Sequence, residues 1–154
     1  MFQLSERAQD YYDRTKTFIK NEIEPVETEF WHQVHALNTD GDWTKWQWPE
    51  QLEILKNKAK TAGLWNMFLP DPILGQGLSV QEYAHIAELS GRSLIAPIVF
   101  NCNAPDSGNM ELIWRYGNDL QKQQWLMPLL DGKIRSVFCM TEPAVASSDA
   151  TNMQ

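Results

Sequence analysis

The chain has 154 residues, of which 43% are hydrophobic, and 13 Lys and Arg stand against 20 Asp and Glu for a formal net charge of −7. This length suits one domain, or one domain with part of a second, and the hydrophobic content is enough for a core. The acidic balance disfavours binding to nucleic acid or to an anionic membrane. No stretch approaches the roughly 18 unbroken apolar residues of a membrane-spanning helix. Cys102 and Cys139 are too few for a disulfide framework and fit a reducing compartment. The sequence therefore predicts a soluble, cytoplasmic protein with no membrane span.

The N-terminal part of the chain has the pattern of a long amphipathic helix. Apolar residues recur at steps of three and four from Ala8 to Leu37, which builds one apolar face. Pro25 interrupts the pattern, and a proline inside a helix removes a hydrogen bond and clashes with the preceding turn. We therefore expect a kink, or a second helical segment that begins at Pro25.

Further helices are predicted from start and stop signals. A stretch from 94 to 100 contains Pro97 and is either a short helix or a buried extended segment. The predicted helices run from Pro49 through Lys60 with a stop at Gly63, from a capping box at Ser79 and Glu82 to about Ser90, from Met110 to Tyr116, and from a second capping box at Asn118 and Gln121 to about Met127, with Pro128 to Gly132 closing it.

Only Ile134 to Met140 resembles a strand. The predicted fold is therefore mainly α: an all-helical bundle domain over 1–132, followed over 133–154 by the start of an incomplete β-domain. A single strand cannot satisfy its own backbone groups. Its partner strands would have to come from further sequence or from another chain.

A chemistry-bearing pattern follows this predicted strand. Thr141, Glu142 and Pro143 form a turn signal, and small and hydroxyl residues follow it up to Thr151. Small residues let a flat ligand approach backbone amides, and amides together with Ser and Thr hydroxyls suit phosphates or ring heteroatoms. The alternative interpretation is an ordinary turn that leads into a tail.

Three segments together resemble the acyl-CoA dehydrogenases. They read AGLWNMFLP at Ala62 to Pro70, YGNDLQKQQWLMPLLDG at Tyr116 to Gly132, and FCMTEPAVASSD at Phe138 to Asp149. They occur in the order of that family and cover nearly the whole chain. Ala104 to Met110 and the C-terminal MTEPAVASSDATN are similar to the subgroup of family members ten and eleven.

The resemblance implies an N-terminal helical domain followed by the first strand of a β-domain, with FAD bound between that β-domain and a C-terminal helical domain. It also implies fatty acid oxidation: α,β-dehydrogenation of an acyl-CoA thioester to its trans-2-enoyl product. Electrons would pass to an electron-transferring flavoprotein or to oxygen. Members of such a family would be expected to form homodimers or tetramers.

The resemblance further implies cofactor-binding residues. Phe138 and Met140 match positions that line the flavin ring, and Thr141 matches a threonine whose hydroxyl and amide face the flavin. Ser148 matches a serine that contacts cofactor phosphate or the substrate's phosphate and pantetheine. The spacing here is one residue longer than the common pattern, and Ser147 stands where glycine is usual, so Ser147 and Ser148 are both candidates.

No catalytic residue is assigned. In the family the base is a glutamate of the C-terminal domain, and no residue of this chain matches it. We therefore expect the isolated chain to be inactive and to bind FAD weakly or not at all. The polar residues Asn101, Asn103, Asp106 and Asn109 are predicted to line the acyl pocket, and the alternative is a surface loop.

Two other functions stay open. Glu29 with His32 and Glu82 with His85 are Glu-x-x-His pairs on predicted helices, and with Glu53 and Glu111 they would complete a di-iron carboxylate bundle. The other alternative is a non-catalytic helical interaction module. The tryptophans Trp43, Trp46 and Trp48 would then form a partner surface, although rings of this kind more often cover the underlying bundle.

Overall fold

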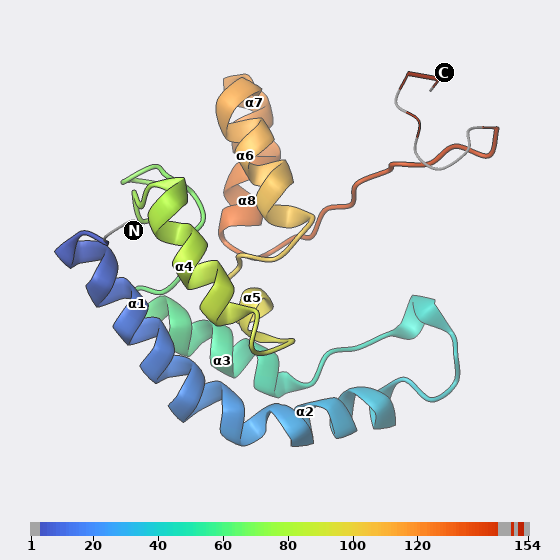
Figure 1. The fold of residues 1–154 in the computed structure, drawn as a ribbon. Coiled ribbons are helices and arrows are strands. Elements are labelled where there is room, and N and C mark those ends of the chain that lie inside the picture. The colour runs from blue at the N-terminus through green and yellow to red at the C-terminus, as the bar shows by residue number, and fades with distance from the viewer. Residues whose placement is uncertain (1–3, 145–148, 150, 153–154) are drawn as a thin grey trace.

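A computed structural model describes residues 4–144, 149 and 151–152 of the chain. The described part contains helices and no strand, which confirms the mainly α fold, and none of these helices is long and apolar enough to cross a membrane (Figure 1). The elements are α1 (Glu6–Phe18), η1 (Ile19–Ile23), α2 (Glu24–Leu37), η2 (Trp43–Lys45), α3 (Glu50–Thr61), α4 (Val80–Ser90), α5 (Ala96–Val99), α6 (Asp106–Tyr116), α7 (Asp119–Gln121), η3 (Lys122–Leu126) and α8 (Met127–Leu130).

The first two helices run end to end as one bent rod along the lower edge of the molecule (Figure 1). The wide π-helical turn η1 joins them, and the N–H of Glu24 bonds to the carbonyl of Ile19, five residues earlier. Pro25 follows directly, in the first turn of α2. The wider turn lets the helix pass a proline that the regular α pattern would not accept. The predicted kink is confirmed, and α2 begins at Glu24, one residue before Pro25.

The same arrangement recurs near the C-terminal end of the helical part. The N–H of Met127 bonds to the carbonyl of Lys122 across the π-helical turn η3, and Pro128 follows directly in α8. The helix expected to end at about Met127 therefore continues three residues further, into the segment from Pro128 to Gly132 that was expected to close it. The helix continues to Leu130 because η3 accommodates the proline, as η1 does for Pro25.

The other helix boundaries follow the sequence signals closely. Both capping boxes form, α4 ends at Ser90, and Gly63 adopts a φ of +66° after α3. The ambiguous stretch 94–100 contains the short helix α5. Helix α6 begins at Asp106, four residues before the expected Met110, because Pro105 lies just before its first turn, where a missing N–H costs no hydrogen bond.

The buried apolar residues form two clusters. The larger one packs α1, η1, α2, α3, α4 and α5 together, and in it the rings of Phe18 and Phe100 meet edge to face at 5.5 Å. The smaller one joins the loop before α4 to α6, η3 and α8 through Phe68, Leu69, Met110, Leu126, Leu129 and Leu130. Tyr83 and Cys102 contact both clusters, so the two clusters adjoin one another.

The strand expected from Ile134 to Met140 does not form. After Gly132 the chain leaves the helices as an irregular segment that runs out from the body of the molecule (Figure 1). The described residues offer no neighbouring strand whose backbone could pair with it, and an unpaired strand is not stable in water. Cys139, which a buried strand would have hidden, is exposed for the same reason. The division of the chain at 132/133 stays a prediction.

Candidate functional site

The candidate cofactor residues lie on the segment that leaves the helices. Phe138 is 65% exposed and Met140 is 50% exposed, and Thr141 directly after them is exposed as well. Three of the five candidates therefore share one short stretch of chain. Ser147 and Ser148 lie outside the described residues.

A first set of contacts, which we call the carbonyl cap, holds the chain where helix α8 ends. The last carbonyls of a helix have no partner within it. The indole Nε1 of Trp65 donates to the carbonyl of Leu130 at 2.7 Å, and Asn66 Nδ2 donates to the same carbonyl at 3.0 Å. Asn101 Nδ2 donates to the carbonyl of Leu129 at 3.0 Å and to Asn66 Oδ1 at 2.7 Å. Side chains from two loops thus do what a C-cap would do.

The turn after α8 depends on Gly132. This residue has a φ of +72°, and a Cβ atom placed on it would lie 2.9 Å from Cζ2 of Trp65. Lys60 Nζ lies 4.3 Å from the centre of a Trp65 ring and donates to the carbonyl of Asp131 at 2.8 Å. The turn is therefore packed closely against Trp65, and it sets the direction in which the chain leaves the helix.

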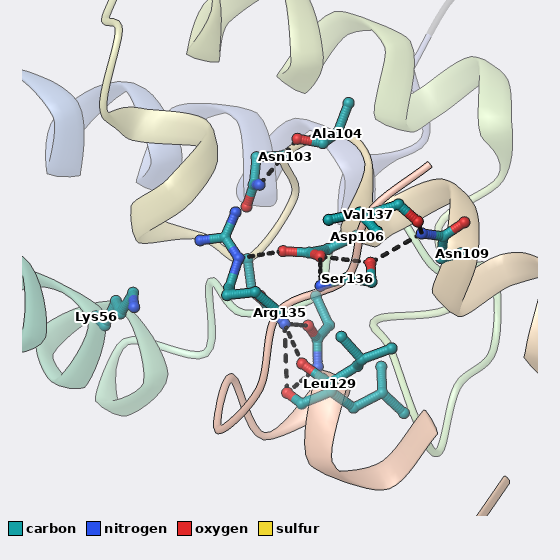
Figure 2. A network of polar contacts seen from close by, with 12 residues as sticks. Lys56, Asn103, Ala104, Asp106, Asn109, Leu129, Arg135, Ser136 and Val137 are labelled. Atoms are coloured by element: carbon teal, nitrogen blue, oxygen red, sulfur yellow. Dashed lines mark hydrogen bonds and ion pairs between the residues drawn. The ribbon is translucent and has the colours of Figure 1, made fainter. Parts of the chain in front are cut away.

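A second set of contacts, which we call the Asp106 clamp, holds residues 135–137 (Figure 2). Asp106 is 1% exposed, and its Oδ1 accepts from the backbone N–H of Ser136 at 2.7 Å and from the Ser136 hydroxyl at 2.6 Å. Its Oδ2 lies 2.5 Å from Nε of Arg135. Asn109 Nδ2 donates to the Ser136 hydroxyl at 2.9 Å and to the carbonyl of Val137 at 3.2 Å. Oδ1 of this buried carboxylate is thus hydrogen-bonded by the segment that carries Phe138, and among the described residues Oδ2 has only the ion pair with Arg135.

These contacts give the polar residues after α5 a role that sequence reasoning missed. Asn101, Asp106 and Asn109 bind the protein's own chain, so they do not form a plain surface loop. Asn103 donates to the carbonyl of Ala104, while its Oδ1 is buried without a partner in the part of the chain that the structure describes. The signal for this role was present, because four polar side chains are unusual in so short a stretch of a helical domain. The partners of Asn101, Asp106 and Asn109 lie 27 to 35 residues away and have no mark in the sequence.

A small pocket adjoins the Asp106 clamp. Its volume is about 250 Å³, and one polar side chain of the predicted acyl-pocket set, Asn109, lies in its wall. The other lining residues are Leu112, Ile113, Trp125, Leu129, Ile134, Arg135, Ser136 and Val137. Side chains of α6, η3 and the outgoing segment therefore meet around one mostly apolar hollow.

The thiol of Cys102 is not an activated nucleophile. Burial raises the pKa of the Cys102 thiol to about 11 and also raises the pKa of the neighbouring Tyr83 hydroxyl. At neutral pH Cys102 is therefore a protonated thiol, and a thiol in that state is a poor nucleophile.

The six candidate ligands of a di-iron site do not come together. Within residues 4–144, 149 and 151–152 no group of three or more His, Cys, Asp or Glu side chains is placed to hold a metal ion. Each carboxylate has a local partner instead. Glu82 completes its capping box, Glu29 faces His32 at 3.7 Å, Glu53 pairs with Lys56 at 2.7 Å, and Glu111 pairs with Arg115 at 2.8 Å. The described structure does not support the di-iron bundle.

Comparison with known proteins settles the family. The sequence model of the family described as "Acyl-CoA dehydrogenase, N-terminal domain" matches residues 5–133. The chain belongs to the acyl-CoA dehydrogenase family. It is 51% identical over 154 residues to acyl-CoA dehydrogenase family member 11 of Rattus norvegicus, and 48% identical over 156 residues to member 10 of Mus musculus. The resemblance to the subgroup of members ten and eleven is thereby confirmed.

A solved acyl-CoA dehydrogenase structure has the same fold. A Mycobacterium abscessus protein described as an acyl-CoA dehydrogenase is 55% identical, with a TM-score of 0.89 over 99% of this chain and 38% of its own. The match to the rat relative includes the whole of this chain but only 19% of the relative's own length. Phe138, Met140 and Thr141 lie just beyond residue 133, where the match to the acyl-CoA dehydrogenase N-terminal domain ends.

Proposed function

We propose that this chain supplies the N-terminal helical domain and one flavin-facing segment of an FAD-dependent acyl-CoA dehydrogenase. The reaction of the whole protein would be α,β-dehydrogenation of an acyl-CoA to its trans-2-enoyl product, a step of fatty acid oxidation. The observation that carries the proposal is the placement of Phe138, Met140 and Thr141. They follow directly on residues 135–137, which Asp106 and Asn109 hold, in a chain of this family.

The residues present fit one wall of a flavin site. Val137, Phe138 and Met140 are 77%, 65% and 50% exposed, so a row of apolar side chains stands open on one short segment. Such exposed apolar surface commonly marks a binding site. Thr141 adds a hydroxyl and a backbone N–H, which are suitable donors for the heteroatoms of a flat ring. The segment thus offers apolar cover together with hydrogen-bond donors.

In this proposal the residues of the chain bind and shield. When bound, FAD supplies the two-electron acceptor of the reaction. Phe138 and Met140 exclude water from one side of the ring, and Thr141 donates hydrogen bonds to its edge. Ser147 or Ser148 contacts a phosphate of the cofactor, or the phosphate and pantetheine of the substrate. The catalytic base would lie outside these 154 residues, so the isolated chain would be inactive and would hold FAD weakly or not at all.

The pocket beside the Asp106 clamp supports a place for the acyl chain. Leu112, Ile113, Trp125 and Leu129 contribute apolar side chains to its wall, and alkyl chains gain free energy when such surfaces leave water. We place the acyl group of the substrate there. The electron acceptor would be an electron-transferring flavoprotein or oxygen, and the whole protein would be a cytoplasmic homodimer or tetramer.

Anaerobic spectroscopy tests this function. The full-length protein that contains this chain is loaded with FAD, and acyl-CoAs of increasing length are added without oxygen. We expect the visible flavin absorbance to bleach as the flavin is reduced. Thr141→Val should weaken FAD binding through its lost hydroxyl. A protein that takes up no FAD, or whose flavin no acyl-CoA reduces, would be a helical interaction module and not a dehydrogenase.

A further inference from the structure

We propose that Asp106 and Asn109 are positioning residues for the cofactor: the Asp106 clamp fixes the register of residues 135–137 and thereby the place at which Phe138, Met140 and Thr141 meet the flavin. This inference rests on the proposed function. None of the candidate flavin contacts belongs to α6. In this inference α6 nevertheless fixes the position of the segment that carries them.

The hydrogen bonds of the clamp act on the backbone as well as on side chains. Asp106 Oδ1 accepts from the N–H of Ser136, and Asn109 Nδ2 donates to the carbonyl of Val137. Bonds to one N–H and to the next carbonyl fix the rotation of the chain about its own axis. A slip by one residue at the clamp would change the position and direction of every side chain that follows it. The clamp therefore decides which side chains of 138–141 face the same way.

The clamp also lies close to the residues that it would control. Phe138 is two residues beyond Ser136, and an extended chain spans about 3.3–3.6 Å per residue. The backbone of Phe138 can therefore lie at most about 7 Å from the backbone of Ser136, which the clamp holds. Upstream, the carbonyl cap holds Leu129 and Leu130, so the segment leaves a body that is itself fixed.

Charge explains why this contact is specific. A carboxylate that is 1% exposed is costly to bury unless both its oxygens have partners. Ser136 provides two donors to Oδ1 and Arg135 provides the charge opposite Oδ2. Asp106 lies in the first turn of α6, where the helix dipole also favours a negative charge. The carboxylate is thus held by the helix on one side, and it is matched by the outgoing segment on the other.

The test uses FAD binding by the full-length protein and two variants of the clamp. Asp106→Asn keeps the shape of the side chain and removes its charge, and Asn109→Ala removes the bonds to Ser136 and Val137 without touching the buried charge. The matched control is Glu111→Gln, which breaks an ion pair on the exposed side of the same helix, where Glu111 meets Arg115 at 2.8 Å. The readouts are the FAD dissociation constant, from flavin fluorescence, and the visible spectrum of the bound flavin.

We expect Asp106→Asn and Asn109→Ala each to weaken FAD binding by about tenfold, the size of one lost hydrogen bond to a charged or well-placed group, and to shift the bound-flavin spectrum. Glu111→Gln should leave both unchanged. If the clamp variants fold and bind FAD with unchanged affinity and spectrum, the inference is overturned.

A separate readout distinguishes failure of this inference from failure of the proposed function. Hydrogen exchange of the Ser136 amide is measured in the 154-residue chain, where no flavin is needed. Loss of its protection in Asp106→Ala, which removes the accepting oxygen, but not in Glu111→Gln, supports the clamp even if the wild-type protein takes up no FAD, a result that would count against the proposed function alone. Equal protection in all three chains overturns the clamp itself.

Discussion

Two asparagines show how single residues organise this chain. Asn66 and Asn101 both have a φ of 55°, the left-handed region that asparagine tolerates better than most residues. Their amides meet each other and the end of α8. Neither residue lies in a sequence pattern that announces a cap, because their partners are distant in the chain. The run of polar residues that begins at Asn101 was therefore visible in the sequence, while its structural role was not.

Gly132 gives a sharp test at the residue scale. Gly132→Ala should lower the free energy of unfolding by about 2–4 kcal/mol, since it adds left-handed strain and a clash with Trp65. Gly41→Ala is the matched control, because Gly41 has a φ of +71° with no atom within 4 Å of the added Cβ. The control should lose only about 1 kcal/mol. Equal losses in urea denaturation would contradict the packing of the turn on Trp65.

Asp71 links the free energy of unfolding to pH, through hydrogen bonds in the loop before α4. The N–H of Leu74, together with the N–H of Ile73 and the indole of Trp114, holds the pKa of this carboxyl below its ordinary value of 3.8. A carboxyl with a lowered pKa in the folded state stabilises the fold above that ordinary value. The contribution is lost as pH falls through the lower, folded-state pKa.

Asp71→Asn should therefore be less stable than the wild type at pH 7, and the gap should narrow toward pH 3. Urea denaturation at both pH values measures it. Asp10→Asn, which removes only a surface contact with Arg14, is the control and should show a smaller gap at pH 7. A gap for Asp71→Asn that stays constant across this range would contradict the assignment.

At the scale of the elements, two prolines show that a local sequence pattern does not predict whether a helix continues past a proline. Pro25 and Pro128 each follow a π-helical turn; the predicted kink at Pro25 forms, whereas the helix predicted to run to about Met127 continues past Pro128 to Leu130. The sequence rule says that a proline disturbs a helix, and it does not say whether the helix resumes. After Pro128 the helix resumes, and Leu129 and Leu130, at 3% and 4% exposed, pack into the smaller cluster. Burial of these leucines is a tertiary effect that no local pattern records.

The starts of α4 and α7 were predictable because their capping boxes are local signals, whereas α6 begins four residues before the expected Met110. The capping box of α4 also has a tertiary contact, since the Ser5 hydroxyl donates to Glu82 Oε1 at 2.6 Å and ties the start of α1 to the start of α4. Ser79→Ala should cost about 1 kcal/mol of the free energy of unfolding, the usual value of an N-cap. Thr17→Ala, at an exposed position inside α1, should change it by less than about 0.5 kcal/mol. Thermal or urea unfolding that ranks the two in the opposite order would contradict the role of the box.

The predicted strand does not form because it has no neighbouring strand in the described residues. Ile134 to Met140 has the composition of a strand, but a strand exists only with a neighbour, and the described residues provide none. The three described cofactor candidates came from a family resemblance and were found on one segment. Whether they contact a flavin depends on groups outside this chain, so their roles stay a prediction.

On the scale of the whole molecule, the helical body and the outgoing segment are distinct. The two core clusters adjoin through Tyr83 and Cys102, whereas Val137 and Phe138 are mostly exposed. The helices and the Asp106 clamp should therefore supply the free energy of unfolding, and the residues after the clamp should add little to it.

Truncation tests that statement. A chain that ends at Met140 should keep the free energy of unfolding within about 0.5 kcal/mol of the full 154 residues, because the contacts of the clamp are retained. A chain that ends at Lys133 should lose about 2 kcal/mol, since Asp106 is left without Ser136 and Arg135. Equal stability of the two truncated chains in urea would show that the clamp does not hold the segment.

We propose that this chain forms one wall of a flavin site and not a complete site. The most direct measurement is a visible absorbance titration with FAD, carried out on the 154-residue chain and on the full-length protein that contains it. We expect the isolated chain to leave the spectrum of free FAD unchanged, and the full-length protein to give a shifted bound-flavin spectrum that bleaches on addition of acyl-CoA. A bound flavin that bleaches in the isolated chain would contradict the division of the site, and no bound flavin in either protein would contradict the proposed function.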